Sequence, residues 1–337
     1  MKRKSYKLLS LVITAVLLVA MCGGGQALAG AQPIKLRYAS VYTADSHYGR
    51  AIERFKEIVE RESGGALFID TFHDALLGPE SEMIQSQKDG GIEIAFSAAS
   101  GIGLYVPSTL ILESFFAYEK LDEVRNHFES LREELDAAYQ AEGFKLIGGF
   151  YDGYRNILSK NKPIYNLDDV KRLKMRSPTN PMYSGCIEAL GAQAIAMPLG
   201  DVYTSLQTGA IEACEGTLDT IYNQKFYEQA KYLIWDSHTW VPMSVTFNLA
   251  SWNSLSGEHQ KIILDAAAKA TEYQVELFNA QCDRQLEEMK ATGVTVCEVT
   301  DREKWVEAVA PVLEKLANQY GELGIKIYES QKALQHK

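Results

Sequence analysis

The sequence is poor in cysteine, and the few cysteines are not spaced to bind a metal. Five occur in 337 residues, and only Cys22 lies near the N-terminus; the others are Cys186, Cys214, Cys282 and Cys297. No two form a Cys-x-x-Cys motif, which argues against a zinc site or a dithiol redox centre. The four later cysteines allow three full disulfide pairings or four free thiols, and the sequence leaves both outcomes open.

Recognisable catalytic motifs are also lacking. The chain has no Gly-x-Ser-x-Gly elbow, no phosphate-binding P-loop and no Gly-x-Gly-x-x-Gly. Its histidines are scattered and match no metal motif: His47, His73, His127, His238, His259 and His336. A catalytic pair of carboxylates that are distant in sequence stays open. We therefore expect no metal or cofactor, and a binding protein is favoured over an enzyme.

Long apolar runs are confined to the N-terminus. Four basic residues precede an apolar run over 8–21, and Ala27-Leu28-Ala29 follows as a cleavage site. This pattern predicts a secretory signal peptide over residues 1–29. Lipidation of Cys22 is the less favoured alternative, because the bulky Met21 precedes it. The mature chain is expected to be soluble and periplasmic.

Positive charge is scarce once this leader is removed. The remaining chain has 30 Lys+Arg against 44 Asp+Glu, a net charge of −14. Nucleic acid and anionic membrane surfaces are therefore unlikely partners by charge. An acidic protein that binds anions must do so through individual basic residues.

Strand and helix patterns alternate along the chain, which predicts an α/β fold rich in parallel sheet. Strands are expected at "IKLRYAS", "ALFIDTF", "IEIAFSA" and "FKLIGGFY", with helices starting near Ser46 and Pro79 and a single helix over 121–141. Residues 232–249 are expected to be extended. The pattern over residues 256–292 predicts a helix about 50 Å long, at 1.5 Å per residue, which either braces both lobes or breaks at a kink.

Two similar stretches of sequence, an internal echo, indicate two similar lobes. "QKDGGIEIA" (87–95) and "LQTGAIEAC" (206–214) both join a helix end to a strand through glycine. The second copy lies within its own run of alternating elements, in which the strand "AIAMP" is followed by a short helix over 201–208 and by the strand "IEACEG". Two related βαβ units on one chain predict two α/β lobes joined by strand crossings.

Arg176 ends a short alternating stretch, "RLKMRSPTN", in which Pro178 stops the strand. Ligands of open α/β sheets gather at strand ends, so we expect Arg176 to face an anion. Aromatic residues also cluster near predicted strand ends, as core packing or as a ligand-covering wall; they include Tyr38, Tyr42, Tyr48, Phe72, Phe96, Tyr105, Phe150, Tyr151 and Tyr154.

At these residues the sequence resembles the substrate-binding proteins of TRAP (tripartite ATP-independent periplasmic) transporters. The resemblance is carried, in order, by "GYRNILS", "NLDDVKRLKMRSP", "LGAQAIAMPLGDVYTSLQTGAIEACEG", "KFYEQAKYL" and "NLASWNSLSGEHQKII". It implies a two-lobed clamshell with a long helix across both lobes. It further implies capture of an organic acid, delivery to membrane permease subunits driven by a sodium gradient, and no catalysis. The implied lobes are 30–152 with 242–281 (lobe I), and 153–241 with 282–337 (lobe II).

The resemblance also implies site residues. Arg176 is expected to clamp the ligand carboxylate through its planar fork of donors, with assistance from Arg155. Glu215 is expected to orient an arginine or to contact a ligand amino group. The remaining expected ligand-binding residues are Tyr42, His47, Phe72, Ser97, Thr179, Leu199, Gly216 and Thr217.

Gly216 occupies a position where the family often has the side-chain amide of Asn or Gln. Together with the tyrosines, the space at Gly216 predicts a ligand with an apolar or aromatic body. An extracytoplasmic enzyme, or a ligand-loaded partner of a sensor, remains the alternative on the same scaffold.

Overall fold

The computed structural model describes residues 32–335, and from residue 35 onward the described chain forms one compact unit. The predicted signal peptide and Cys22 lie outside the described residues. No helix within the described range is long and apolar enough to cross a membrane. The strands are β1 (Ile34–Ala39), β2 (Leu67–Phe72), β3 (Ile94–Ser97), β4 (Phe144–Ser159), β5 (Lys174–Ser177), β6 (Gln193–Ala196), β7 (Ala213–Thr217), β8 (Tyr232–Asn248) and β9 (Thr295–Glu298).

The helices occupy the stretches between these strands, which confirms the predicted α/β alternation. They are α2 (His47–Glu62), α3 (Glu80–Lys88), α4 (Ala99–Ile102), α5 (Leu121–Ser130), α6 (Arg132–Ala141), α7 (Leu167–Val170), α8 (Pro181–Ala189), α9 (Val202–Thr208), α10 (Leu218–Asn223), α11 (Phe226–Gln229), α12 (Leu249–Ser254), α13 (Gly257–Ala291), α14 (Arg302–Gln319) and α15 (Gly321–Gln335), with 3₁₀ turns η1 (Pro107–Glu113) and η2 (Leu199–Asp201).

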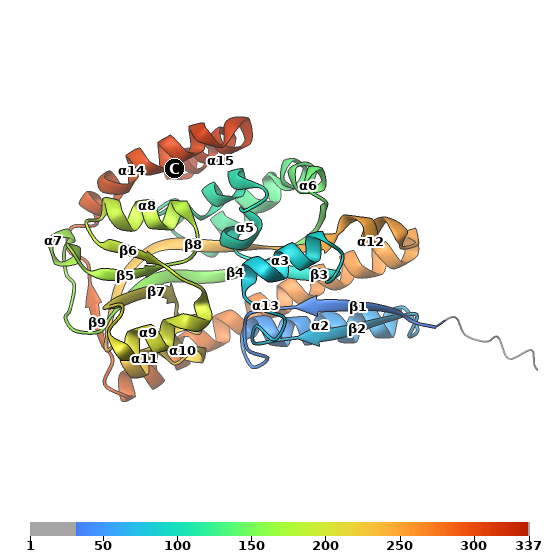
Figure 1. Ribbon diagram of the computed structural model, residues 1–337, viewed down its shortest axis with the longest axis horizontal. Coiled ribbons are helices and arrows are strands. Elements are labelled where there is room, and N and C mark those ends of the chain that lie inside the picture. The colour runs from blue at the N-terminus through green and yellow to red at the C-terminus, as the bar shows by residue number, and fades with distance from the viewer. Residues whose placement is uncertain (1–31, 336–337) are drawn as a thin grey trace, which may run out of the picture. The chain divides into compact units, whose positions relative to one another are not determined.

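The strands of the described residues form one mixed sheet in the order β2-β1-β3-β8-β4-β7-β5-β6, with β9 beside β8. The order is symmetric about the long antiparallel pair β4/β8 (Figure 1). On one side β3 runs parallel to β1 and antiparallel to β8, and on the other β7 runs parallel to β5 and antiparallel to β4. The fold is therefore a two-lobed α/β clamshell, in which each lobe carries half of the sheet.

The predicted internal echo is a structural repeat. Gly90 follows α3 and Gly209 follows α9, with φ of 81° and 78°. This left-handed region suits glycine at a helix C-terminus. The strands that follow, β3 and β7, each lie between a parallel neighbour and a long antiparallel strand. The two similar sequences thus build equivalent positions in the two halves of the sheet.

The prediction of one helix over 121–141 is wrong, because two helices meet at Leu131. Leu131 leaves helical geometry with φ −104° and ψ 6°. The turn allows Leu135 and Tyr139 of α6 to join the hydrophobic core that also holds Phe128 of α5. Side-chain burial here overrides the helical propensity of the local sequence.

Helix α13 is continuous over its 35 residues, so of the two outcomes left open by the sequence the structure has the unbroken helix. It contacts α2, β4 and α10 (Figure 1). Its buried residues pack with both ends of the sheet: Ile263 and Ala266 share a core with α2, whereas Met289 shares a core with β7 and α9–α11. A single helix therefore braces both halves of the molecule.

A β-bulge interrupts the β4/β8 pair near its middle. Tyr151 pairs with Pro242 and Tyr154 pairs with Trp240, so Asp152 and Gly153 together face Val241. The bulge is held by Gln274 of α13, which accepts from the Tyr151 N–H at 2.9 Å and donates to the Tyr151 carbonyl at 2.6 Å. The lobe boundaries expected from the sequence, 152/153 and 241/242, coincide with this bulge and stay a prediction.

The cysteines in the described range are all free. Cys186, Cys214 and Cys297 are buried, and Cys282 is half-buried. Burial raises the pKa of the Cys214 thiol to about 12. Of the outcomes left open by the sequence, the structure has free thiols.

Gly153 is required where the bulge passes under α13. A Cβ at this position would overlap Cζ of Phe278, whose ring is packed against His47 and Trp240. We expect Gly153→Ala to lower the free energy of unfolding by about 1–3 kcal/mol, the usual range for overpacking, as measured by urea denaturation. Gly257→Ala is the control, because nothing lies within 4 Å of its Cβ. Equal stability of both variants would contradict the close approach.

Candidate functional site

Arg176 is a buried guanidinium at the end of β5. Pro178 follows the strand, and the backbone then enters α8, which Asn180 caps by accepting from the Met182 N–H at 2.8 Å. Nε and Nη2 of Arg176 donate to the Met197 carbonyl at 3.2 and 3.1 Å. Since Met197 follows the neighbouring strand β6, the two strand ends fix the side chain. The predicted position of Arg176 at a strand end is confirmed.

Arg155 lies on β4 and forms a buried, forked ion pair with Glu215 of β7. Its Nη2 donates to Glu215 Oε1 at 2.7 Å, and its Nε donates to Oε2. The pairing follows from the antiparallel register: Arg155 faces Thr217, so Glu215 is the diagonal neighbour on the same face. The guanidinium also lies over the Tyr183 ring, 5.3 Å from its centroid.

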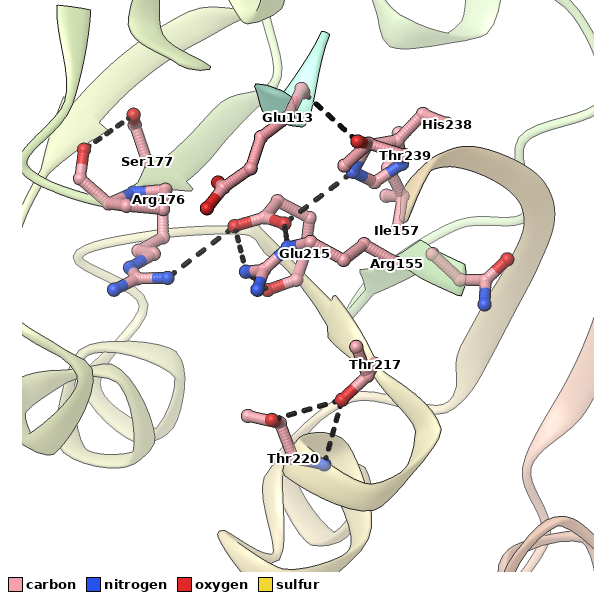
Figure 2. A network of polar contacts seen from close by, with 12 residues as sticks. Glu113, Arg155, Ile157, Arg176, Ser177, Glu215, Thr217, Thr220, His238 and Thr239 are labelled. Carbon is pink, nitrogen blue, oxygen red and sulfur yellow. Dashed lines mark hydrogen bonds and ion pairs between the residues drawn. The ribbon is translucent and has the colours of Figure 1, made fainter. Parts of the chain in front are cut away.

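Glu215 lies between the two arginines, as Figure 2 shows. Its Oε1 accepts from Arg176 Nη1 at 3.4 Å. Burial alone would raise the pKa of Glu215, but the charge of Arg155 and hydrogen bonds from His238 and Arg155 lower it well below its ordinary value. Glu215 is therefore a permanent carboxylate that compensates two positive charges.

The charged groups continue across four adjacent strands. On β8, His238 Nε2 lies 3.5 Å from Glu215 Oε2, and its Nδ1 lies 2.7 Å from Asp236 Oδ2. Asp236 also accepts from the Ile157 N–H at 3.0 Å through Oδ1. Burial opposes a charge on His238, but Asp236 and Glu215 raise its pKa overall. The network thus alternates in sign from Asp236 through His238 and Glu215 to the arginines.

Glu113 is a second buried carboxyl group close to this network (Figure 2). It accepts a hydrogen bond from the Ala99 N–H at 2.5 Å. Burial raises its pKa to about 7, although the Ala99 bond and the charge of Arg155 lower it. Because the pKa of Glu113 is raised and the pKa of Glu215 is lowered, Glu215 is the constant counter-ion of the arginines.

The two arginines open into a cavity of about 480 Å³. Five of the residues expected from the sequence line it: Tyr42, Arg155, Arg176, Thr179 and Leu199. The acidic residues Asp74, Glu80 and Asp201 also line it, together with Thr220 and Gln224. Glu80 accepts from the Ala98 N–H at 3.2 Å. The wall therefore combines a cationic end with acidic and polar groups.

The other expected site residues do not line this cavity. His47 and Glu215 are buried behind its wall, and Thr217 caps α10 by accepting from the Thr220 N–H at 3.2 Å. Phe72 packs against the main core, and the Ser97 side chain is fully buried. Glu215 acts on the arginines, as the orienting role predicts.

The structure does not support the prediction of a ligand with an apolar or aromatic body. A Cβ on Gly216 would contact Ile221 and Thr220 at 3.6–3.8 Å, so the glycine faces α10 instead of the cavity. Among the described residues that line the cavity, Tyr42 is the only aromatic one. Tyr38, Tyr48, Phe96 and Phe150 belong instead to the core around α2.

The loop "HDALLGPES" (73–81) supplies Asp74, Gly78 and Glu80 to the wall, and these residues were not predicted from the sequence. A usable signal was present, because this loop leaves a predicted strand and leads into a predicted helix, where α/β ligand sites form. Met197, Thr220 and Gln224 gave no comparable signal, since only tertiary structure brings them to the arginines.

The site is suited to binding an anion that also carries hydroxyl groups. The guanidinium donors provide charge-assisted hydrogen bonds to a carboxylate, and the acidic side chains can accept from hydroxyls. Within residues 32–335 there is no cluster of histidine, cysteine and acidic residues that could hold a metal ion.

Comparisons with known proteins agree with this geometry. Residues 30–319 match the family described as bacterial extracellular solute-binding protein, family 7. The chain is 27% identical over 297 residues to the 2,3-diketo-L-gulonate-binding periplasmic protein of Escherichia coli, covering 88% of both chains.

Two solved structures have the same fold. One is the sugar acid binding protein of Advenella mimigardefordensis in complex with galactonate, at 28% identity and a TM-score of 0.86, covering 90% of this chain and 99% of that one. The other is a TRAP periplasmic solute-binding protein from Bradyrhizobium with galacturonate, at 27% identity and a TM-score of 0.84, covering 88% and 100%.

Removal of the Glu215 charge should destabilise the protein in a pH-dependent way. Breaking a buried ion pair by removing one partner costs about 3–5 kcal/mol, so we expect Glu215→Gln to lose this amount of unfolding free energy at pH 7. The folded-state pKa is depressed, so the contribution is complete above the ordinary value of 4.5 and is lost as the pH falls below it.

Urea denaturation at pH 7 and at pH 3.5 measures this difference. Glu57→Gln is the control, because Glu57 forms an exposed ion pair with Arg54 at 3.0 Å and should change stability by less than about 1 kcal/mol. A Glu215→Gln penalty that does not shrink at low pH would contradict the assigned ionisation.

Proposed function

The chain belongs to the bacterial extracellular solute-binding proteins of family 7, and from this premise we propose that it captures a sugar acid in the periplasm for a TRAP transporter. The observation that carries the proposal is the pair of buried arginines, held by one glutamate, that lines a cavity of about 480 Å³. The proposed ligand carboxylate binds at Arg176, with Arg155 beside it.

A sugar acid fits the cavity better than a dicarboxylate does. Its carboxylate meets the arginines, and its hydroxyls can donate to Asp74, Glu80 and Asp201. A second carboxylate on the ligand would instead meet these acidic groups. The cavity volume of about 480 Å³ lies within the usual range of about 300–1,000 Å³ for small-molecule sites. The related proteins named above bind diketogulonate, galactonate and galacturonate, which supports the same ligand class.

Closure of the lobes is the proposed functional event, with the hinge at the bulge of β4. Closure excludes water from the carboxylate–guanidinium contact and so strengthens it. Release then requires the lobes to part at the membrane, where we propose that permease subunits driven by a sodium gradient accept the ligand. The family comparison favours this transport role over the enzyme and the sensor-partner alternatives.

Calorimetric titration tests the ligand class. We expect galactonate or galacturonate to bind at least about thirtyfold more tightly than succinate or neutral galactose, because a lost or uncompensated buried charge costs about 2–5 kcal/mol. Succinate that binds as tightly as both sugar acids would contradict the proposed class.

The arginine clamp is tested by Arg176→Ala. We expect the dissociation constant for the bound acid to rise by at least about thirtyfold, because the buried ligand carboxylate would lose its guanidinium partner. The fold should persist, because Glu215 keeps its pair with Arg155. Lys174→Ala is the matched control, since Lys174 is exposed two residues earlier on the same strand. Unchanged affinity of the Arg176 variant would refute the clamp.

A further inference from the structure

A second buried polar cluster lies behind the cavity wall, separate from the arginine network. It consists of His47, Asp152 and Asp219, whose exposed fractions are 0%, 0% and 1%. His47 starts α2, Asp152 sits in the bulge of β4, and Asp219 lies in the first turn of α10. His47 Nε2 is 3.5 Å from Asp152 Oδ1 and 3.4 Å from Asp219 Oδ2.

The orientation of His47 is fixed by α13. The Gln274 amide is held by its two bonds to the Tyr151 backbone, so its Nε2 is a donor. This Nε2 lies 2.8 Å from His47 Nδ1, which must therefore accept. The imidazole proton is then on Nε2, where it faces the two carboxylates.

The carboxylates are also held in place. Asp152 Oδ1 accepts from the Gly153 N–H at 3.0 Å. Asp219 Oδ1 accepts from Gln285 Nε2 at 2.7 Å, which leaves Oδ2 for His47. A bulge re-aims a strand side chain, and here it brings Asp152 between the two helices.

The three residues connect the two halves of the molecule. Neighbours of His47 on α2 belong to the core of β1–β3, whereas Leu218 and Ile221 of α10 belong to the core around β7. The same two halves each contribute to the wall of the ligand cavity, through Tyr42 in the loop before α2 and Thr220 next to Asp219. Separation of the halves would therefore break the His47–Asp219 contact and move both walls.

We propose that His47 is a positioning residue for ligand binding, which with Asp152 and Asp219 forms a latch that holds the two cavity walls together. The proposal rests on the proposed function, because the latch matters only if the lobes close on a ligand. Asp219 accepts from Gln285 and lies 3.4 Å from His47 Nε2 in this arrangement of the halves. Separation of the halves would move His47 away and leave a buried carboxylate with fewer partners, which is costly. The latch forms after the ligand has entered, and it therefore slows dissociation and leaves association unchanged.

Stopped-flow kinetics on the full mature chain test the latch, with whichever of galactonate, galacturonate and succinate binds the wild type most tightly. His47→Phe keeps the ring contacts with Tyr48 and Phe278 and removes the N–H donor. We expect it to dissociate about tenfold faster, with an unchanged association rate and a melting temperature of the ligand-free protein within a few degrees of wild type. His47→Gln retains a donor and should remain within about threefold of wild type.

A double-mutant cycle identifies the partner. Asp219→Asn alone should also speed dissociation, but His47→Phe/Asp219→Asn should dissociate no faster than His47→Phe, because coupled residues are not additive. The control is His259→Phe: His259 lies in the first turn of α13 and does not line the cavity, so its loss should leave dissociation unchanged.

Three results would overturn the latch: additive effects of the two substitutions, an unchanged dissociation rate in His47→Phe, or a change confined to association. Wild-type protein that binds only succinate would contradict the sugar-acid proposal and leave the cycle valid. Wild-type protein that binds none of the three acids would contradict both the sugar-acid proposal and the latch.

Discussion

The structure depends on the compensation of two buried arginines by one glutamate. Neither guanidinium could be kept away from water at this position without a permanent negative charge, and Glu215 supplies it from the strand between them. A single carboxylate cannot saturate two forked cations, so donor capacity is left facing the cavity. One internal anion keeps the site stable, and in the proposed complex the ligand carboxylate is the second anion that completes the charge balance. His238 and Asp236 extend this arrangement into β8 and keep Glu215 in place.

The long strands β4 and β8 provide both the rigidity and the joint of the molecule. They pair along nearly their whole length, so the two halves of the sheet share a common backbone ladder. Near the middle of the pair, two residues of β4, Asp152 and Gly153, oppose one residue of β8. Next to this bulge, Pro242 has no N–H and cannot donate a hydrogen bond to β4. Gln274 replaces the missing partner from α13. The helix thus supports the strands at the point where they are weakest, and it brings the same glutamine to His47.

The sequence predicted the elements with strong local patterns. The length of α13, the strand end at Arg176 and the repeat around Gly90 and Gly209 are encoded in periodicity, proline and glycine, which act over a few residues. The positions that could not be predicted belong to residues whose neighbours come from distant segments of the chain. His47 and Gly216 were expected at the ligand but face other side chains, because their orientation is set by α13 and α10. Likewise, the break at Leu131 follows from packing of Phe128 and Tyr139 in a common core, which no local pattern shows.

The free thiols have a consequence for the life of the protein outside the cytoplasm. Thiol–disulfide exchange needs an accessible thiolate, and burial holds Cys186 and Cys214 in the protonated form by raising the pKa of each thiol. In the folded chain, Cys186 and Cys214 are therefore shielded from the oxidants and disulfide exchangers of an oxidising compartment. The vulnerable interval is the time between export and folding, when all four sulfurs are exposed. Fast folding therefore protects this protein chemically as well as conformationally, and alkylation of these sulfurs would report on transient opening.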